Sequence, residues 1–164
     1  MVHRDIKSAN LLISNDGTLK IADFGLARSL HNPQYAACVE GAPNNIEYTG
    51  MVVTRWYRPP ELLAGRKNYG KEVDMWGIGC ILVEMFYRKP YFMGSSEVDQ
   101  FDLIAKVCGS PNEDTLPGWN SLPGVRNADA QGRLDESITD GVKEFGPYPR
   151  RLKQELTMGT KVHL

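Results

Sequence analysis

One apolar segment, residues 75–87, constrains the fold of this chain more than any other feature. Ten of its thirteen residues are apolar, and the exceptions are two glycines and Glu84. A helix that is apolar on every side is a buried helix, and this one is too short to span a bilayer. The sequence therefore predicts a buried helix over residues 74–87 at the centre of a domain, with Asp74 as its candidate N-cap.

The composition fits one domain with a single core. The chain has 164 residues, 41% of them hydrophobic and 24% charged, and a formal net charge of −1. This balance argues against nucleic acid or an anionic membrane as a direct partner, because proteins that bind these usually carry a basic surplus. The three cysteines lack the spacing of a disulfide framework or a zinc site. We therefore expect them to be small buried side chains.

A β-hairpin is expected near the N-terminus. Residues 11–13 and 18–22 have strand character, and the turn formers Ser14-Asn15-Asp16-Gly17 separate them. Antiparallel pairing of these strands brings Asn10, which precedes the hairpin, to the same end as Asp23, which follows it.

Other segments are expected to be helices and loops. A short helix is predicted over residues 59–65, and an amphipathic, peripheral helix is predicted after the candidate cap Ser96, ending at Cys108. Residues 29–50 indicate a long exposed loop, and residues 112–146 indicate mostly loop with room for a short helix.

Four polar side chains suggest phosphoryl-transfer chemistry. Asn10 and Asp23 offer the hard oxygen ligands that Mg²⁺ prefers. Asp5 is a carboxylate placed to accept a proton from an attacking hydroxyl, and Lys7 is a cation able to neutralise a transferring phosphoryl group. Positioning, charge neutralisation and a weak base are what this reaction needs. Taken alone, each short motif could equally belong to a turn or a solvent-exposed loop without a catalytic role.

The order of the motifs is far more specific than any one of them. The chain reads His3-Arg4-Asp5-x-Lys7-x-x-Asn10, then a hairpin, then Asp23-Phe24-Gly25, then Pro59-Pro60-Glu61. This order and spacing resemble the C-terminal lobe of a eukaryotic protein kinase. The segment from Tyr48 to Leu63 resembles the cyclin-dependent group. The long loop and residues 118–124 resemble its transcription-elongation branch, of the fungal Bur type, with other transcriptional members as close competitors.

The resemblance implies a fold and a domain organisation. The fold class is α+β, a mainly helical lobe with a small β-hairpin at the catalytic loop, truncated at both ends. Residues 1–156 would form a partial kinase domain and residues 157–164 a tail that does not match.

The resemblance also implies roles for residues around the reaction. Asp5 would be the catalytic base, Lys7 would contact the γ-phosphate of ATP, and Asn10 and Asp23 would bind Mg²⁺. Thr49 would be the activating phosphorylation site, for which the alternative is a surface threonine without a role. Arg4 and Arg28 would clamp its phosphate.

Further residues would form the substrate platform and its supports. The platform that selects proline after the target Ser/Thr would comprise Val52, Val53, Thr54 and Arg58. Phe24 would be a hinge between active and inactive arrangements, or a core aromatic. Structural roles fall to Gly25, Glu61, Asp74 and Trp76. Asp74 would brace the catalytic loop, and Glu61 would lack its usual arginine partner.

The function implied is that of a proline-directed Ser/Thr kinase. Its cofactors would be ATP and Mg²⁺, and its partners a cyclin, an activating kinase at Thr49 and proteins with Ser/Thr-Pro sites, such as the C-terminal repeats of RNA polymerase II. The expected location is the nucleus, with the cytoplasm as the alternative. The motifs that bind ATP from the other lobe are missing from this sequence, so the isolated chain is expected to be inactive. The alternative is a non-catalytic binding module or an incomplete gene model.

Overall fold

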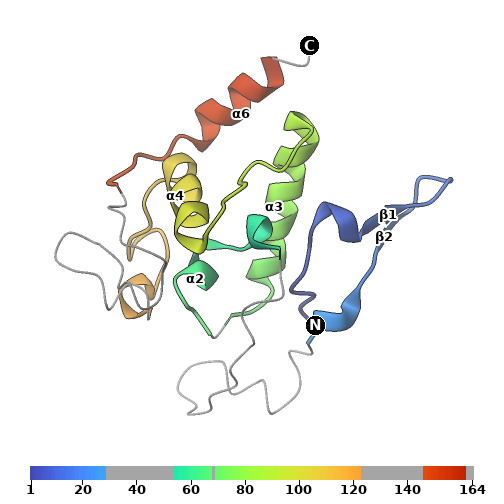
Figure 1. Cartoon of the computed structure of the whole chain (residues 1–164), viewed down its shortest axis with the longest axis horizontal. Helices are drawn as coiled ribbons and strands as arrows, with labels where there is room; N and C mark the ends of the chain where they lie inside the picture. Colours follow the sequence, from blue (N-terminus) through green and yellow to red (C-terminus); the bar gives the residue numbers. More distant parts are fainter. Residues whose placement is uncertain (29–53, 68, 123–145, 162–164) are drawn as a thin grey trace.

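The computed structural model describes residues 1–28, 54–67, 69–122 and 146–161, with side chains to residue 157 (Figure 1). Thr49, Val52 and Val53, the loop expected over residues 29–50 and much of that expected over 112–146 therefore lie outside the described residues. The principal elements are β1 (Leu11–Ile13), β2 (Leu19–Ile21), α2 (Pro60–Leu63), α3 (Glu72–Tyr87), α4 (Glu97–Cys108) and α6 (Leu152–Lys161). Short 3-10 turns are η1 (Ser8–Asn10), η2 (Phe24–Leu26), η3 (Arg55–Tyr57) and η4 (Trp119–Ser121). None of the helices in the described residues is long and apolar enough to cross a membrane.

The expected hairpin is confirmed. Strands β1 and β2 pair antiparallel, with Leu11 opposite Ile21. Gly17 closes the turn with a positive φ of 83°, a conformation that glycine adopts without strain. Figure 1 shows the hairpin reaching out to one side of the helices. Because the backbone N–H of Ala22 donates to the carbonyl of Asn10 at 2.8 Å, Asn10 and Asp23 meet at one end as predicted.

Helix α3 starts earlier than expected, and Asp74 is not its cap. The N-cap is Lys71, which makes no capping side-chain hydrogen bond. Asp74 lies in the first turn, and its carboxylate instead accepts the backbone N–H groups of His3 and Arg4, each at 2.8 Å. The capping prediction was wrong because both carboxylate oxygens of Asp74 accept hydrogen bonds from this distant loop instead of from the start of the helix.

Helix α3 is also not buried on every side. One face is buried, through Val73, Gly77, Cys80 and Ile81. The other face exposes Met75, Ile78, Leu82, Met85 and Phe86, of which Met85 is 71% exposed. The apolar run predicted the helix correctly, but its prediction of all-round burial is wrong, since the described residues do not cover this second face.

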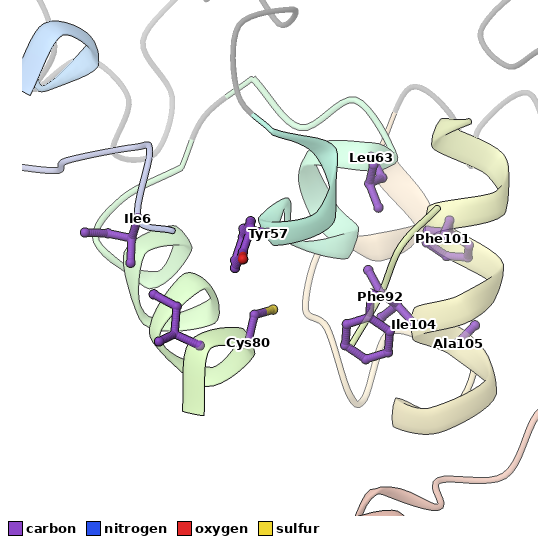
Figure 2. Packing of buried hydrophobic residues seen from close by; sticks show 9 residues of the cluster. Ile6, Tyr57, Leu63, Cys80, Phe92, Phe101, Ile104 and Ala105 are labelled. Atoms are coloured by element: carbon purple, nitrogen blue, oxygen red, sulfur yellow. The ribbon is translucent and has the colours of Figure 1, made fainter. Parts of the chain in front are cut away.

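The core lies between α3, α4 and the segments that carry η3 and α2. Its buried residues are Ile6, Tyr57, Leu63, Cys80, Ile81, Phe92, Phe101, Ile104 and Ala105 (Figure 2). The two cysteines that the structure describes are free thiols; Cys80 is buried and Cys108 is half-buried. Burial raises the pKa of the Cys80 thiol to about 12, which keeps it protonated and unreactive.

Helix α4 begins as predicted, because the Ser96 side chain accepts the backbone N–H of Asp99 at 3.1 Å. It is less peripheral than expected. Gln100 is fully buried: its side-chain oxygen accepts the Gly94 N–H at 2.9 Å, and its side-chain nitrogen donates to the Trp56 carbonyl at 3.3 Å. Helix α4 thus fixes the loop before it to the segment around η3.

Helix α6 contacts the C-terminal ends of helices α3 and α4. The Tyr87 hydroxyl at the end of α3 donates to the Glu155 carbonyl at 2.8 Å, and the Arg151 N–H donates to the Val107 carbonyl at 2.8 Å. The boundary expected between residues 156 and 157 falls inside this helix, and its backbone continues to Lys161.

Candidate active site

Asp5 is the centre of a small buried network in the loop before the hairpin. It is 4% exposed. The Lys7 ammonium donates to its Oδ2 at 2.7 Å, and the Asn10 side-chain nitrogen donates to the same oxygen at 3.2 Å and to the Asp5 carbonyl at 2.8 Å. Its other oxygen, Oδ1, is buried and has no hydrogen-bond partner among the described residues. The carboxylate is therefore held through Oδ2, while Oδ1 is buried and unpaired within the described residues.

Asn10 and Asp23 meet one test of a magnesium site, the chemistry of their donors. The nitrogen of the Asn10 amide makes the bonds to Asp5, so the amide oxygen is left for another ligand. Asp23 is exposed and accepts only a long bond from the Gly25 N–H, at 3.4 Å, in the described residues. No three His, Cys, Asp or Glu side chains gather into a metal cluster in those residues. Mg²⁺ commonly takes one or two protein oxygens and completes its shell with phosphate and water, so the pair fits.

The absence of a side chain at Gly25 leaves space for the Asp23 carboxylate. Asp23 adopts a left-handed backbone with φ of 62°, which is uncommon outside glycine. A Cβ on Gly25 would lie 3.2 Å from Asp23 Oδ1. A side chain at residue 25 would therefore crowd the oxygen offered to the metal.

Phe24 is not a core aromatic in this structure. It is 50% exposed, and its ring meets the edge of the His3 ring with centroids 4.9 Å apart. His3 itself is buried, with Nε2 3.0 Å from the Ala22 carbonyl and Nδ1 accepting the Asp5 N–H at 3.3 Å. The imidazole thus packs against the loop and links Asp5 to the end of the hairpin.

The two arginines of the expected phosphate clamp lie on paired backbone segments. Val2 and Arg28 form an antiparallel bridge through hydrogen bonds of 2.8 and 2.9 Å, and Arg4 follows two residues later. The Arg4 Nε donates to the Leu26 carbonyl at 2.6 Å, and Arg28 is exposed. Their expected target, Thr49, lies outside the described residues.

Of the expected substrate platform, the structure describes Thr54 and Arg58. Arg58 pairs with Glu97 in the first turn of α4. Its neighbour Arg55 donates to the Ser95 carbonyl at 2.6 Å. These contacts attach the segment around η3 to the N-terminal end of α4.

A sequence profile described as "Protein kinase domain" matches residues 1–145. The chain belongs to the protein kinase family.

This kinase chain is similar to cyclin-dependent kinases and to serine/threonine-protein kinases of the Bur type. It is 48% identical over 155 residues to the "Probable cyclin-dependent kinase 9" of Schizosaccharomyces pombe, covering 93% of this chain and 24% of that protein. It is 51% identical over 140 residues to a serine/threonine-protein kinase of the Bur type from Yarrowia lipolytica, covering 82% of this chain and 20% of that protein. The kinase chain thus spans about a quarter of the length of these relatives.

A solved structure supports the same relationship. The kinase chain matches the "Crystal Structure of the yeast RNA Pol II CTD kinase CTDK-1 complex" with a TM-score of 0.73 and 38% identity, covering 96% of this chain and 44% of that chain. The expected kinase-like fold and the expected similarity to the Bur-type branch are therefore confirmed.

Two supporting residues of the kinase chain have unusual surroundings. Glu61 is 7% exposed, and burial raises the pKa of its carboxyl; its side chain has no ion pair among the described residues. Trp76 stacks on Phe92 with centroids 6.3 Å apart, and its buried indole N–H is without a partner in those residues. The structural roles expected of these two side chains stay predictions.

Some contacts of the kinase chain have no signal in the sequence. The Tyr57 hydroxyl contacts Ser8 and Glu84, and the Gln100 side chain bonds to Gly94 and to the carbonyl of Trp56 within η3. Tyr57 and Ser8 are 49 positions apart. No local pattern identifies such a pair, and only the burial expected of an aromatic residue between polar neighbours hints at a partner for the hydroxyl.

Proposed function

We propose that the protein containing this chain is an ATP- and Mg²⁺-dependent Ser/Thr kinase directed to Ser/Thr-Pro sites. One observation carries the proposal. Asp5 Oδ1 is buried and without a partner in the described residues, while Oδ2 is held by Lys7 and Asn10. An unpaired buried acceptor costs free energy, and a catalytic role is one of the recognised explanations for such a group in a native structure.

Asp5 acts on the substrate hydroxyl through Oδ1. The substrate Ser/Thr donates its O–H to this oxygen, which orients the hydroxyl toward the γ-phosphoryl group of ATP. As the new O–P bond forms, the bond from the γ-phosphorus to the bridging oxygen breaks, ADP leaves, and Asp5 accepts the hydroxyl proton. Lys7 holds Oδ2, so the carboxylate cannot turn away from the hydroxyl. In this position the Lys7 ammonium also offsets negative charge on the transferring group.

Asn10 and Asp23 hold Mg²⁺ through their side-chain oxygens. When bound there, Mg²⁺ would supply charge neutralisation for the phosphate groups of ATP. The left-handed backbone at Asp23 and the small residue Gly25 keep that carboxylate accessible.

The platform around Arg58 provides substrate selection. A proline after the target residue has no N–H that needs a partner, so it fits a platform where a buried N–H would be left unpaired. Val52, Val53 and Thr54 complete this platform. Phosphorylation of Thr49 by an activating kinase, with Arg4 and Arg28 clamping the phosphate, orders the segment.

The relatives support the choice of partners. A cyclin is the proposed regulatory subunit, because similar proteins are cyclin-dependent kinases. The C-terminal repeats of RNA polymerase II are the proposed substrate, because the similar CTDK-1 complex is an RNA Pol II CTD kinase. The nucleus is the corresponding location.

A peptide pair tests the proposal. The native kinase, purified through a tag on its gene together with its associated subunits, is incubated with Mg²⁺, γ-labelled ATP and a Ser-Pro repeat peptide or its Ser-Ala counterpart. We expect Mg²⁺-dependent transfer to the Ser-Pro peptide and little to the Ser-Ala peptide. Equal transfer to both would refute proline direction, and no transfer would refute the proposed activity.

A further inference from the structure

Ser8 makes a side-chain contact that the proposed chemistry does not use. Its hydroxyl lies 3.0 Å from the hydroxyl of Tyr57, which comes from η3. The Tyr57 hydroxyl donates in turn to Glu84 Oε2 of α3, at 2.5 Å. Three segments far apart in the chain thus meet at a single phenol oxygen.

Ser8, Tyr57 and Glu84 form a relay of hydrogen bonds, and the direction of each bond in this relay is fixed. Tyr57 has one O–H, and it is given to Glu84. Ser8 must therefore donate to the Tyr57 oxygen, because that oxygen has no second proton to offer. Burial, followed by the bond to Glu84, raises the pKa of Tyr57 to about 12, so the phenol keeps its proton throughout the physiological range.

The tyrosine end of the relay is rigid. Tyr57 is 7% exposed and belongs to the buried core, where Figure 2 shows it above the side chain of Cys80. Its backbone N–H donates to the Thr54 carbonyl at 3.2 Å, and Arg58 follows it directly. The phenol oxygen is therefore a fixed point attached to the substrate platform.

The serine end of the relay lies inside the catalytic loop. Ser8 follows Lys7 and begins the turn η1 that ends at Asn10, whose backbone N–H donates to the Lys7 carbonyl at 3.0 Å. Lys7 and Asn10 are the two side chains that hold Asp5 Oδ2. A movement of Ser8 thus shifts both groups that orient the carboxylate.

We propose that Ser8 is a positioning residue, which ties the turn between Lys7 and Asn10 to the platform through Tyr57 and so sets the distance between Asp5 and the bound substrate. This role rests on the proposed kinase function. It acts through position alone, because Ser8 contacts neither Asp5 nor, in this scheme, the substrate. Small misplacements of a reacting group lower turnover more than they lower binding.

Serine variants of the native kinase complex test the role. We expect Ser8→Ala to lower kcat for the Ser-Pro peptide by about three- to tenfold, the range of one lost hydrogen bond, with KM for ATP unchanged. Ser8→Thr keeps a hydroxyl and should restore turnover. Ser121→Ala, which removes an exposed serine hydroxyl bonded to the Gly118 carbonyl, is the matched control and should behave as wild type.

Two further readouts separate positioning from general stability. Ser8→Ala should lower the thermal midpoint by no more than one lost hydrogen bond accounts for, and amide hydrogen exchange should speed locally at Asn10 and Leu11, next to the contact that Ser8 makes. The double variant with Tyr57→Phe should be no slower than Tyr57→Phe alone, because both remove the same connection.

The outcomes are distinguishable. Wild-type turnover and unchanged exchange in Ser8→Ala, or effects of Ser8→Ala and Tyr57→Phe that multiply, would overturn the positioning role and leave the kinase function standing. A wild-type complex that transfers no phosphate would overturn the kinase function and the positioning role together.

Discussion

The carboxylate of Asp74 holds the backbone of Arg4 in a left-handed conformation. Asp74 Oδ1 accepts the Arg4 N–H at 2.8 Å, and the φ of Arg4 is 71°. A non-glycine residue in this region costs of the order of 1 kcal/mol or more and persists only where its surroundings impose it. Asp5 follows directly, so the central helix α3 determines how the candidate base is presented.

Replacing Asp74 by asparagine should loosen this arrangement. One acceptor oxygen becomes an NH₂ group that faces a backbone N–H, so one of the two hydrogen bonds to the loop is lost. We expect the free energy of unfolding to fall by about 1–3 kcal/mol, as for other hydrogen bonds to charged groups. Denaturant unfolding measures the loss, and turnover of the native kinase should fall with it.

The exposed Asp114 provides the matched control for this change. Asp114→Asn removes the same charge without touching the loop and should leave stability and turnover unchanged. If Asp74→Asn and Asp114→Asn behave alike, the brace between α3 and the loop has no energetic importance.

Two glycines of α3 test how closely the helix approaches the loop. A Cβ on Gly77 would lie 2.8 Å from the carbonyl oxygen of Ile6, whereas a Cβ on Gly79 would meet nothing within 4 Å. Gly77→Ala should therefore destabilise the protein by about 1–3 kcal/mol through overpacking. Gly79→Ala should stabilise it by about 0.5–1 kcal/mol through helix propensity.

In thermal unfolding, we expect Gly77→Ala to lower the midpoint temperature and Gly79→Ala to raise it. Gly77→Ala should also lower turnover, because Ile6 follows Asp5 directly. A Gly77→Ala variant as stable as Gly79→Ala would show that the helix does not press against the catalytic loop.

The sequence was sufficient for features that depend on neighbouring residues. The hairpin followed from its turn residues, the start of α4 from Ser96, and the meeting of Asn10 with Asp23 from antiparallel pairing. These signals are local, and the structure satisfies them within a few residues of the chain.

Features that depend on distant segments were predicted poorly. Asp74 has the pattern of a helix cap, yet contacts with a loop 71 and 70 positions away claim its carboxylate. The apolar run gave helix α3 but not its exposed face, because burial depends on what else packs there. Tyr57 and Ser8 carry no pattern at all, since side-chain hydrogen bonds across the fold leave no periodic signal.

The buried Glu61 predicts a pH dependence of stability. Burial raises the pKa of this carboxyl in the folded state above its ordinary value of 4.5, so the folded chain binds its proton more tightly than the unfolded chain does. The associated stability is fully present below that ordinary value and is lost as the pH rises through the raised pKa. Glu61→Gln, which cannot ionise, should therefore be more stable than wild type at neutral pH and lose this advantage in acid.

Glu113 supplies a contrast of opposite sign. Backbone N–H groups of Asn120 and Gly118 lower the pKa of its exposed carboxyl. The stability that this carboxylate contributes is present above its ordinary pKa and is lost as the pH falls through its lowered, folded-state pKa. Glu113→Gln should therefore be less stable than wild type at neutral pH. Chemical unfolding from acid to neutral pH compares the variants. A Glu61→Gln variant less stable than wild type at neutral pH would mean that the carboxylate has a cationic partner.

The most direct test of the central claim is the turnover of Asp5→Asn in the native kinase complex. Asparagine keeps the size of Asp5 and an acceptor for Lys7 but cannot take the proton of the substrate hydroxyl. We expect kcat for the Ser-Pro peptide to fall by about a hundredfold or more, the usual contribution of a general base, while KM for ATP changes little. Turnover within a few-fold of wild type would contradict the assignment of Asp5 and, with it, the account of this site.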